Sequence, residues 1–133
     1  MAWRYLDLAD FLLIAEAVLQ TPAEDLARIT RIDLAESALH APAATFGSVE
    51  FYPDLASKTA VLCSRIIRNH PLPDGNKRLG YLCALEFVAR NGGRWTPPAD
   101  DPEGDATVAV IQALAAGDLS ETDFTGWIGD RLA

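Results

Sequence analysis

Two helix-like stretches that meet at a proline- and glycine-containing turn most constrain how this chain can fold. In residues 55–68, apolar side chains recur at three- and four-residue spacing, which is typical of a helix with one buried face. Pro71 disfavours helical geometry at His70, and the residues that follow have turn composition. A second helical run begins near Asn76 and ends at the glycines 92–93. The sequence therefore predicts a helical hairpin near the middle of the chain.

Similar periodicity predicts further helices on both sides of this hairpin, over residues 6–19, 22–29, 33–41, 103–116 and from 120 onward. Residues 46–52 combine aromatic and β-branched residues around a central Gly-Ser pair, which favours a small β-hairpin, although a surface loop fits them equally well. The sum is an all-α fold of six or seven helices. The length of 133 residues predicts one domain over residues 1–133.

Several of these helices carry recognisable start signals. Asp7 and Ser120 each precede an apolar helical run and are suitable N-caps. Thr21 is followed three residues later by Glu24, which forms the pattern of a capping box, and residues 33–36 repeat it. We therefore expect side-chain caps at the starts of these four helices.

Composition excludes several classes of partner and location. The net charge of −8 opposes direct nucleic-acid binding, because phosphate contacts supply most of that affinity. No apolar run approaches the ~20 residues that cross a bilayer, and the N-terminus lacks the pattern of a signal peptide, so no membrane association is expected. Cys63 and Cys83 fall on apolar helix faces, as reduced core thiols do. These features predict a cytoplasmic protein.

The turn between the two central helices has the composition of a phosphate site. A glycine-containing turn that opens onto a helix leaves backbone N–H groups without partners, and such helix starts bind anions. Lys77 and Arg78 add two positive charges beside them. We therefore assign Gly75, Asn76, Lys77 and Arg78 to a phosphate cradle. Arg68 is added as a candidate ligand, although an exposed helix face explains it at least as well.

Two further residues of this turn suit the chemistry of phosphoryl transfer. The carboxylate of Asp74 is out of place beside an anion unless a cation lies between them, and Mg²⁺ commonly takes one or two carboxylates plus substrate phosphates. His70, at the beginning of the turn, can accept a proton from an attacking hydroxyl. The predicted site therefore has His70 as the general base and Asp74 as the metal ligand.

These residues resemble the signature of the Fic/Doc family, His-x-Phe-x-Asp/Glu-Gly-Asn-Gly-Arg-x-x-Arg, and more narrowly its Doc branch, which has Lys at the second Gly of the Gly-Asn-Gly-Arg segment. The matching residues are His70, Asp74, Gly75, Asn76, Lys77 and Arg78. Flanking segments agree, among them residues 34–39, 42–47, 52–55 and 87–92. The resemblance covers roughly residues 6–131 and implies a compact Fic/Doc-type helical bundle with a small β-hairpin flap.

The resemblance implies an activity as well as a fold. Fic enzymes transfer AMP from ATP, whereas Doc phosphorylates a threonine of elongation factor Tu, with ATP bound in the reverse sense. A long cationic side chain at Lys77, where Fic enzymes have glycine, disfavours the Fic mode of binding. We therefore expect a Doc-like kinase and toxin that uses ATP and Mg²⁺ and arrests translation. The flap residues Gly47, Ser48, Val49 and Glu50 correspond to the segment that aligns the target.

A Doc-like protein also implies a partner, because the inhibitory Ser/Thr-x-x-x-Glu-Gly/Asn helix of many Fic proteins has no counterpart here. Glu103-Gly104 comes closest, but Ala99 stands at the Ser/Thr position. Restraint is then expected from a cognate antitoxin whose disordered segment folds into the groove.

Three residues depart from the Fic signature. Leu72 replaces Phe, a conservative change in a side chain that we expect to anchor the loop in the core, and Tyr81 stands in place of the second Arg. Gly80 lies within the second helix, where glycine is unfavourable by roughly 1 kcal/mol relative to alanine. The alternatives that remain are a Fic-type AMP transferase and a catalytically inactive domain that only binds its antitoxin.

Overall fold

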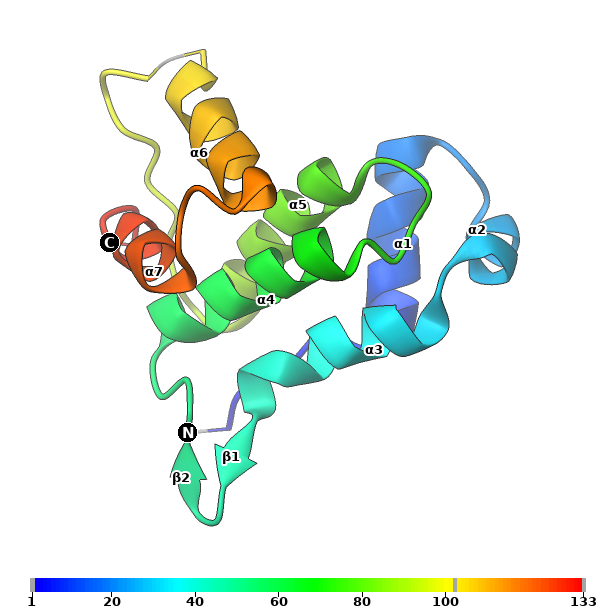
Figure 1. Cartoon of the computed structure of the whole chain (residues 1–133), viewed down its shortest axis with the longest axis horizontal. Coiled ribbons are helices and arrows are strands. Elements are labelled where there is room, and N and C mark those ends of the chain that lie inside the picture. The colour runs from blue at the N-terminus through cyan, green and yellow to red at the C-terminus, as the bar shows by residue number, and fades with distance from the viewer. Residues whose placement is uncertain (1, 102, 133) are drawn as a thin grey trace.

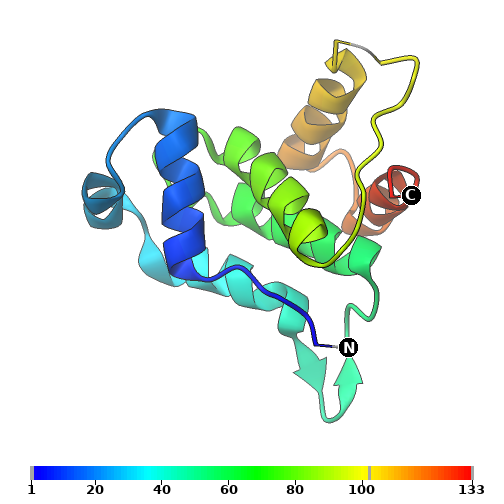
Figure 2. The ribbon, with the colours of Figure 1, turned by 180° about the vertical axis from the view of Figure 1, so that it is seen from behind.

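Helices α4 (Leu55–Asn69) and α5 (Asn76–Arg90) occupy the centre of the computed structural model, which describes residues 2–101 and 103–132. In Figures 1 and 2, α1 (Leu8–Leu19), α2 (Ala23–Ile29) and α3 (Ile32–His40) lie on one side of this pair. Helices α6 (Asp105–Ala116) and α7 (Glu121–Gly129) lie on the other side (Figure 1). The described residues thus contain seven α-helices, which confirms the predicted all-α class.

A small antiparallel hairpin interrupts the helices between α3 and α4. A 3₁₀ turn at Ala41–Ala43 leads into strand β1 (Thr45–Phe46), which pairs with strand β2 (Val49–Glu50). Gly47, at the turn, has φ +64°, a left-handed conformation that glycine adopts without steric cost. The hairpin predicted from the aromatic and β-branched residues is therefore present.

The central helices are buried on two sides because each packs against both outer groups of helices. One apolar cluster joins α1 and α3 to α4 and α5 through residues that include Phe11, Leu39, Ile66 and Phe87. A second cluster joins α6 and α7 to the opposite faces through Cys63, Ala84, Leu114, Phe124 and Ile128. Cys63 and Cys83 are both buried and unpaired, as their apolar neighbours in the sequence predicted.

Gly80 lets the two central helices approach each other closely. A Cβ atom placed there would lie 2.9 Å from a side-chain carbon of Ile67 and 3.1 Å from the carbonyl oxygen of Cys63. The glycine that looked unfavourable inside a helix is thus required by helix packing, and its close neighbour is the backbone of α4.

The four predicted caps had mixed outcomes. Asp7 and Ser120 cap α1 and α7, accepting hydrogen bonds from the N–H groups three residues later, at 2.8 and 3.0 Å. The predicted capping boxes of α2 and α3 were wrong. The Thr21 hydroxyl donates to the carbonyl of Leu19, and the start of α2 is capped by the carboxylate of Glu16, 2.7 Å from the N–H of Ala23.

Helix α3 begins at Ile32, one residue before the predicted start, and its N-cap Arg31 makes no side-chain capping bond. Its beginning is held instead by a contact distant in sequence, because the N–H of Arg31 donates to the carbonyl of Pro71 at 2.8 Å.

No helix within the described residues is long and apolar enough to cross a membrane.

Candidate active site

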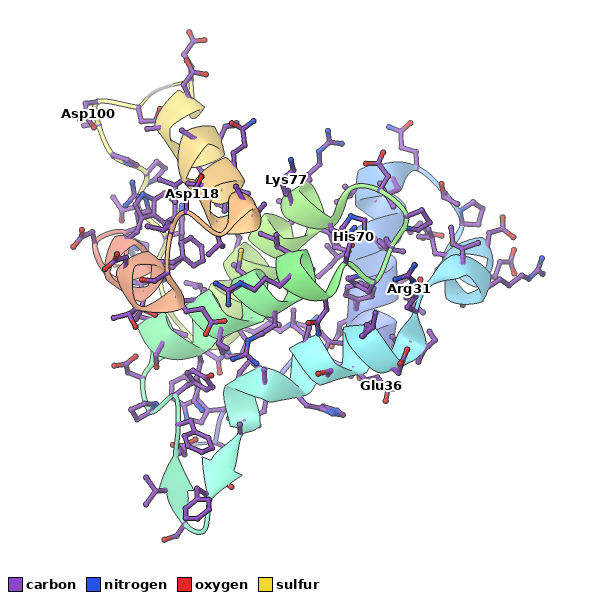
Figure 3. All side chains as sticks on the ribbon, in the orientation of Figure 1. Arg31, Glu36, His70, Lys77, Asp100 and Asp118 are labelled. Atoms are coloured by element: carbon purple, nitrogen blue, oxygen red, sulfur yellow. The ribbon has the colours of Figure 1, made fainter. Side chains whose placement is uncertain are left out.

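His70 lies at the C-terminal end of α4 in a conformation unusual for a non-glycine residue. Its φ and ψ are 52° and 56°, in the left-handed region, and its N–H donates to the carbonyl of Ile66 at 3.2 Å. This capping geometry ends the helix and turns the chain away. The imidazole is exposed, and Figure 3 shows it at the same end of the α4–α5 pair as Lys77. His70 is therefore free to meet a ligand.

The turn that follows His70 is closed by the side chain of Asn76. Its Nδ2 donates to the carbonyl of Leu72 at 2.8 Å, and its Oδ1 accepts from the N–H of Leu72 at 3.1 Å. Asn76 is 4% exposed, and the Leu72 side chain is 1% exposed within the first apolar cluster. The expectation that Leu72 anchors this loop in the core is confirmed. Asn76 uses its amide to hold the turn, so what it offers a ligand is its backbone N–H.

Gly75 forms the junction between the turn and α5, where an added side chain would press against Leu19. Its φ is +80°, and a Cβ atom there would lie 2.6 Å from Cδ2 of Leu19. Leu19, from the end of α1, is thus a close wall of the turn. This contact could not be predicted from the sequence, because the two residues are far apart along the chain.

The first turn of α5 has backbone N–H groups without partners among the described residues. No hydrogen bond formed among the described residues uses the N–H of Asn76, Lys77 or Arg78. These three N–H groups and the helix dipole make the site attractive to an anion. The side chains of Lys77 and Arg78 are exposed beside them. These groups therefore lie together at the start of α5, and their role as a phosphate cradle stays a prediction.

These groups border one cavity of about 530 Å³, which we call the turn cavity. Its lining comprises Leu19, Ile67, His70, residues 74–78 and Ala115. The structure therefore brings together six of the predicted site residues, His70 and Asp74 through Arg78, on one concave surface. Leu19, Ile67 and Ala115 add an apolar wall that the motif did not indicate.

One carboxylate oxygen of Asp74 already accepts a hydrogen bond within the turn. Its Oδ1 accepts a hydrogen bond from the N–H of Gly75 at 2.8 Å, which leaves the Oδ2 atom for another ligand. Mg²⁺ is commonly held by one carboxylate together with substrate phosphates and water. An exposed carboxylate next to a phosphate cradle fits that requirement. Among the residues the structure describes, no three His, Cys, Asp or Glu side chains could hold a metal ion by themselves.

Arg68, a predicted phosphate ligand, contacts a different partner. Its guanidinium lies 3.6 Å from the carboxylate of Glu121 on α7, which also receives a 2.9 Å hydrogen bond from Arg65. Burial disfavours the charge of Glu121, but the hydrogen bond and charge of Arg65 outweigh this and hold the pKa of Glu121 below its ordinary value. The two arginines therefore link α4 to α7.

The β-hairpin, Gly47 to Glu50 included, lies beside the opposite end of α4 from His70 (Figure 1). Helix α4 has 15 residues, and at 1.5 Å per residue it spans about 22 Å. The structure thus does not bring the hairpin into the turn cavity. A molecule that contacted both would have to extend along α4.

The hairpin is fixed by a buried lysine that the sequence did not single out for this role. The ammonium of Lys58 donates to the carboxylate of Glu50 at 2.8 Å, the carbonyl of Pro42 at 2.8 Å and the hydroxyl of Tyr5 at 3.0 Å. Burial lowers the pKa of Lys58, but the hydrogen bonds with Glu50 and Tyr5 outweigh it and raise that pKa overall. Lys58 therefore ties β2 and the N-terminal segment to α4.

Comparison with known proteins shows the family to which the chain belongs. The model of the Fic/DOC family matches residues 5–88, well over half of the chain and the whole of the turn. The chain is also similar to a protein named Toxin Doc from Mycolicibacterium smegmatis, with 42% identity over 59 residues. That match covers 44% of this chain and 45% of the relative, so it spans less than half of either protein. From the extent of the family match, this chain belongs to the Fic/DOC family.

Proposed function

We propose that this protein is a Doc-like toxin that transfers the γ-phosphoryl group of ATP to a serine or threonine hydroxyl of a translation protein. The observation that carries the proposal is the convergence of His70, three free N–H groups and two cationic side chains on the turn cavity. Phosphoryl transfer depends mainly on positioning and on charge stabilisation, and these groups supply both.

Each residue has a defined part in the proposed reaction. His70 accepts the proton of the acceptor hydroxyl as its oxygen forms a bond to the γ-phosphorus. The bond between that phosphorus and the β–γ bridging oxygen breaks, and ADP leaves. The N–H groups of residues 76–78, with Lys77 and Arg78, hold the phosphate oxygens and offset their charge. Asp74 would hold Mg²⁺, which supplies further charge neutralisation on the phosphates.

The acceptor we propose is elongation factor Tu, as the Doc resemblance implies, which places the target in the cytoplasm. An extended segment of that protein could run along α4, from the hairpin at residues 47–50 to His70. The hairpin carries three largely exposed apolar side chains, Phe46, Val49 and Phe51, which supports a docking role.

Restraint of the toxin is assigned to a cognate antitoxin. The name of the similar protein, Toxin Doc, supports a toxin–antitoxin pair. A disordered antitoxin segment that folds against the site on binding would block access to His70.

Transfer of label from ATP distinguishes the proposal from its alternatives. The purified protein is incubated with elongation factor Tu, Mg²⁺ and ATP labelled at either the α or the γ position. Label from the γ position alone on the acceptor supports the kinase. Label from the α position would identify an AMP transferase and overturn the proposal. If neither label is transferred and expression of His70→Asn still arrests growth, catalysis has no support. Antitoxin binding would then be the only proposed activity left.

A further inference from the structure

His70 and Gln20 are the two described residues other than glycine that have a positive φ, 52° in each case. This conformation costs free energy because it crowds the Cβ atom, and contacts around the residue must offset that cost. Both residues end a helix, and each N–H donates to the carbonyl four residues earlier, at 2.8 Å for Gln20 and 3.2 Å for His70. The bond at His70 is at the long end of the usual range, so it contributes less to holding the residue.

The residues on either side of His70 are both bonded to the beginning of α3. Nδ2 of Asn69 donates to the carbonyl of Leu34 at 3.0 Å, and the carbonyl of Pro71 accepts from the N–H of Arg31 at 2.8 Å. We call this pair of hydrogen bonds the α3 clamp. Figure 3 shows Arg31 beside the turn that begins at His70. His70 thus lies between two contacts with the same helix.

Gln20 has no counterpart of the α3 clamp. Within the part of the chain that the structure describes, no hydrogen bond joins residues 19–21 to a distant segment, and the hydroxyl of Thr21 donates locally to the carbonyl of Leu19. A left-handed helix end therefore does not need such a clamp in order to form. The clamp occurs at the one of the two residues whose side chain lines the turn cavity.

The α3 clamp connects an exposed residue to a fixed part of the fold. The side chain of His70 is exposed, so packing around the imidazole does not hold it. Helix α3, in contrast, is anchored by Ala35, Ala38 and Leu39, which are buried in the first apolar cluster. Close-packed interiors deform little, so the groups of α3 that form the clamp are fixed relative to α4.

We propose that Asn69 and the N–H of Arg31 are positioning groups, which keep the backbone of His70 left-handed and its imidazole at the turn cavity. This inference rests on the proposed function, in which His70 accepts the proton of the acceptor hydroxyl. A base must lie within hydrogen-bond reach of that proton, and a displacement of about 1 Å can slow a reaction about 10²-fold. ATP is assigned to residues 74–78, whose turn is closed separately by Asn76. Loss of the clamp should therefore affect the rate of transfer and not the binding of ATP.

Two variants each remove one half of the α3 clamp. Asn69→Ala deletes the donor amide, and because alanine forms helix more readily than asparagine, the change does not weaken α4 by its helix propensity. Arg31→Pro deletes the other donor. Arg31 has φ −77°, and Thr30 before it is extended with ψ 135°, so the backbone suits a proline at position 31.

Asn91→Ala is the matched control for these variants. Asn91 directly follows α5 just as Asn69 ends α4, and its Nδ2 also donates to a distant carbonyl, that of Arg4, at 3.0 Å. Asn91 does not line the turn cavity. The control therefore measures the effect of losing such a bond away from His70.

Nuclear magnetic resonance reads the conformation of His70 without any reaction. A positive φ brings the amide and α protons of one residue close together, so the nuclear Overhauser effect between these protons is strong in the left-handed conformation. Gln20 has the same φ and serves as the reference within each spectrum. The single-turnover rate of γ-phosphoryl transfer and the dissociation constant of Mg²⁺–ATP are measured on the same proteins.

We expect Asn69→Ala and Arg31→Pro to weaken the Overhauser effect of His70 and to leave that of Gln20 unchanged. Transfer should slow at least about tenfold, while the dissociation constant of Mg²⁺–ATP stays within about twofold of the wild-type value. Asn91→Ala should change neither the Overhauser effect of His70 nor the rate.

An Overhauser effect of wild-type strength at His70 in both clamp variants would overturn the proposal. An unchanged rate in variants with a weakened effect would overturn it too, as would equal slowing in Asn91→Ala. A wild-type protein that transfers no phosphoryl group would instead overturn the proposed function itself. The Overhauser effect of His70 would then still show whether α3 holds this residue.

Discussion

Asn76 and Leu72 are joined by two hydrogen bonds between the side chain of Asn76 and the two backbone groups of Leu72. Nδ2 of Asn76 lies 2.8 Å from the carbonyl oxygen of Leu72, and Oδ1 lies 3.1 Å from its nitrogen. A second asparagine makes the same pair of hydrogen bonds elsewhere. Oδ1 of Asn91 accepts from the N–H of Arg4 at 2.8 Å, and its Nδ2 donates to the carbonyl of Arg4 at 3.0 Å. Asn91 therefore offers a matched control for substitutions of Asn76.

Asn76→Asp should disrupt the turn, because a carboxylate cannot donate to the Leu72 carbonyl and places negative charge beside it. We expect a loss of about 1–3 kcal/mol in the free energy of unfolding, together with loss of tripolyphosphate binding. Asn91→Asp should also lose stability but keep that binding. Denaturant unfolding and calorimetry measure the two effects. Equal retention of binding in both variants would show that Asn76 does not shape the site.

Gly75→Ala tests how closely Leu19 confines the turn. The substitution adds strain at φ +80° and a carbon atom 2.6 Å from Leu19. Gly117→Ala is its control, because Gly117 has φ +82° with no atom within 4 Å of the added carbon. We expect Gly117→Ala to lose about 1 kcal/mol of unfolding free energy and Gly75→Ala to lose more. Addition of Leu19→Ala should recover part of the extra loss; no recovery would mean that Leu19 is not the obstacle.

Much of this fold follows from local sequence pattern. The end of α4 was predicted within one residue and that of α5 within two or three, because Pro71 and the glycines at 92–93 act on the chain next to them. The caps by Asp7 and Ser120 were predicted for the same reason. The common location of residues 75–78, the candidate phosphate cradle, could be predicted because a turn and the helix that follows it are adjacent in sequence.

The features that were missed depend on contacts between distant residues. Glu16, in place of Thr21, caps the start of α2, and the N–H of Arg31 at the start of α3 donates to the carbonyl of Pro71. No local pattern encodes either contact. The interaction of Arg68 with Glu121 likewise requires α7 to pack on α4.

The contact between Lys58 and Glu50 is expected to restrain the β-hairpin, and two variants test this. Glu50→Gln removes a partly exposed charge, so the free energy of unfolding should change by less than about 1 kcal/mol while amide exchange at residues 45–50 becomes faster. Lys58→Met leaves the carboxylate of Glu50 and the carbonyl of Pro42 without their donor, and should lose about 3–5 kcal/mol. Hydrogen exchange read by mass spectrometry measures the hairpin. Unchanged exchange in Glu50→Gln would show that Lys58 does not restrain it.

Asp10 makes stability depend on acidic pH. Its carboxylate receives two hydrogen bonds from Arg90, at 2.9 and 3.0 Å, and these hold the pKa of Asp10 below its ordinary value. A lowered pKa in the folded state stabilises the protein above the unfolded-state value of about 4, and that stability is lost as pH falls through the folded value.

Asp10→Asn should therefore lower the free energy of unfolding by about 1–3 kcal/mol at pH 7 and by less at pH 3. Denaturant unfolding of both proteins at a series of pH values gives this difference. If the difference in unfolding free energy between the two proteins did not change with pH, the charge of Asp10 would not contribute to the stabilising contact with Arg90.

The most direct test of the account is the single-turnover rate of γ-phosphoryl transfer by His70→Asn, measured with its affinity for Mg²⁺–ATP. Asparagine tolerates the left-handed backbone that His70 adopts, so the turn should persist without its base. We predict a rate about 10²–10⁴-fold lower with nearly unchanged ATP affinity. Transfer at the wild-type rate by this variant would contradict it.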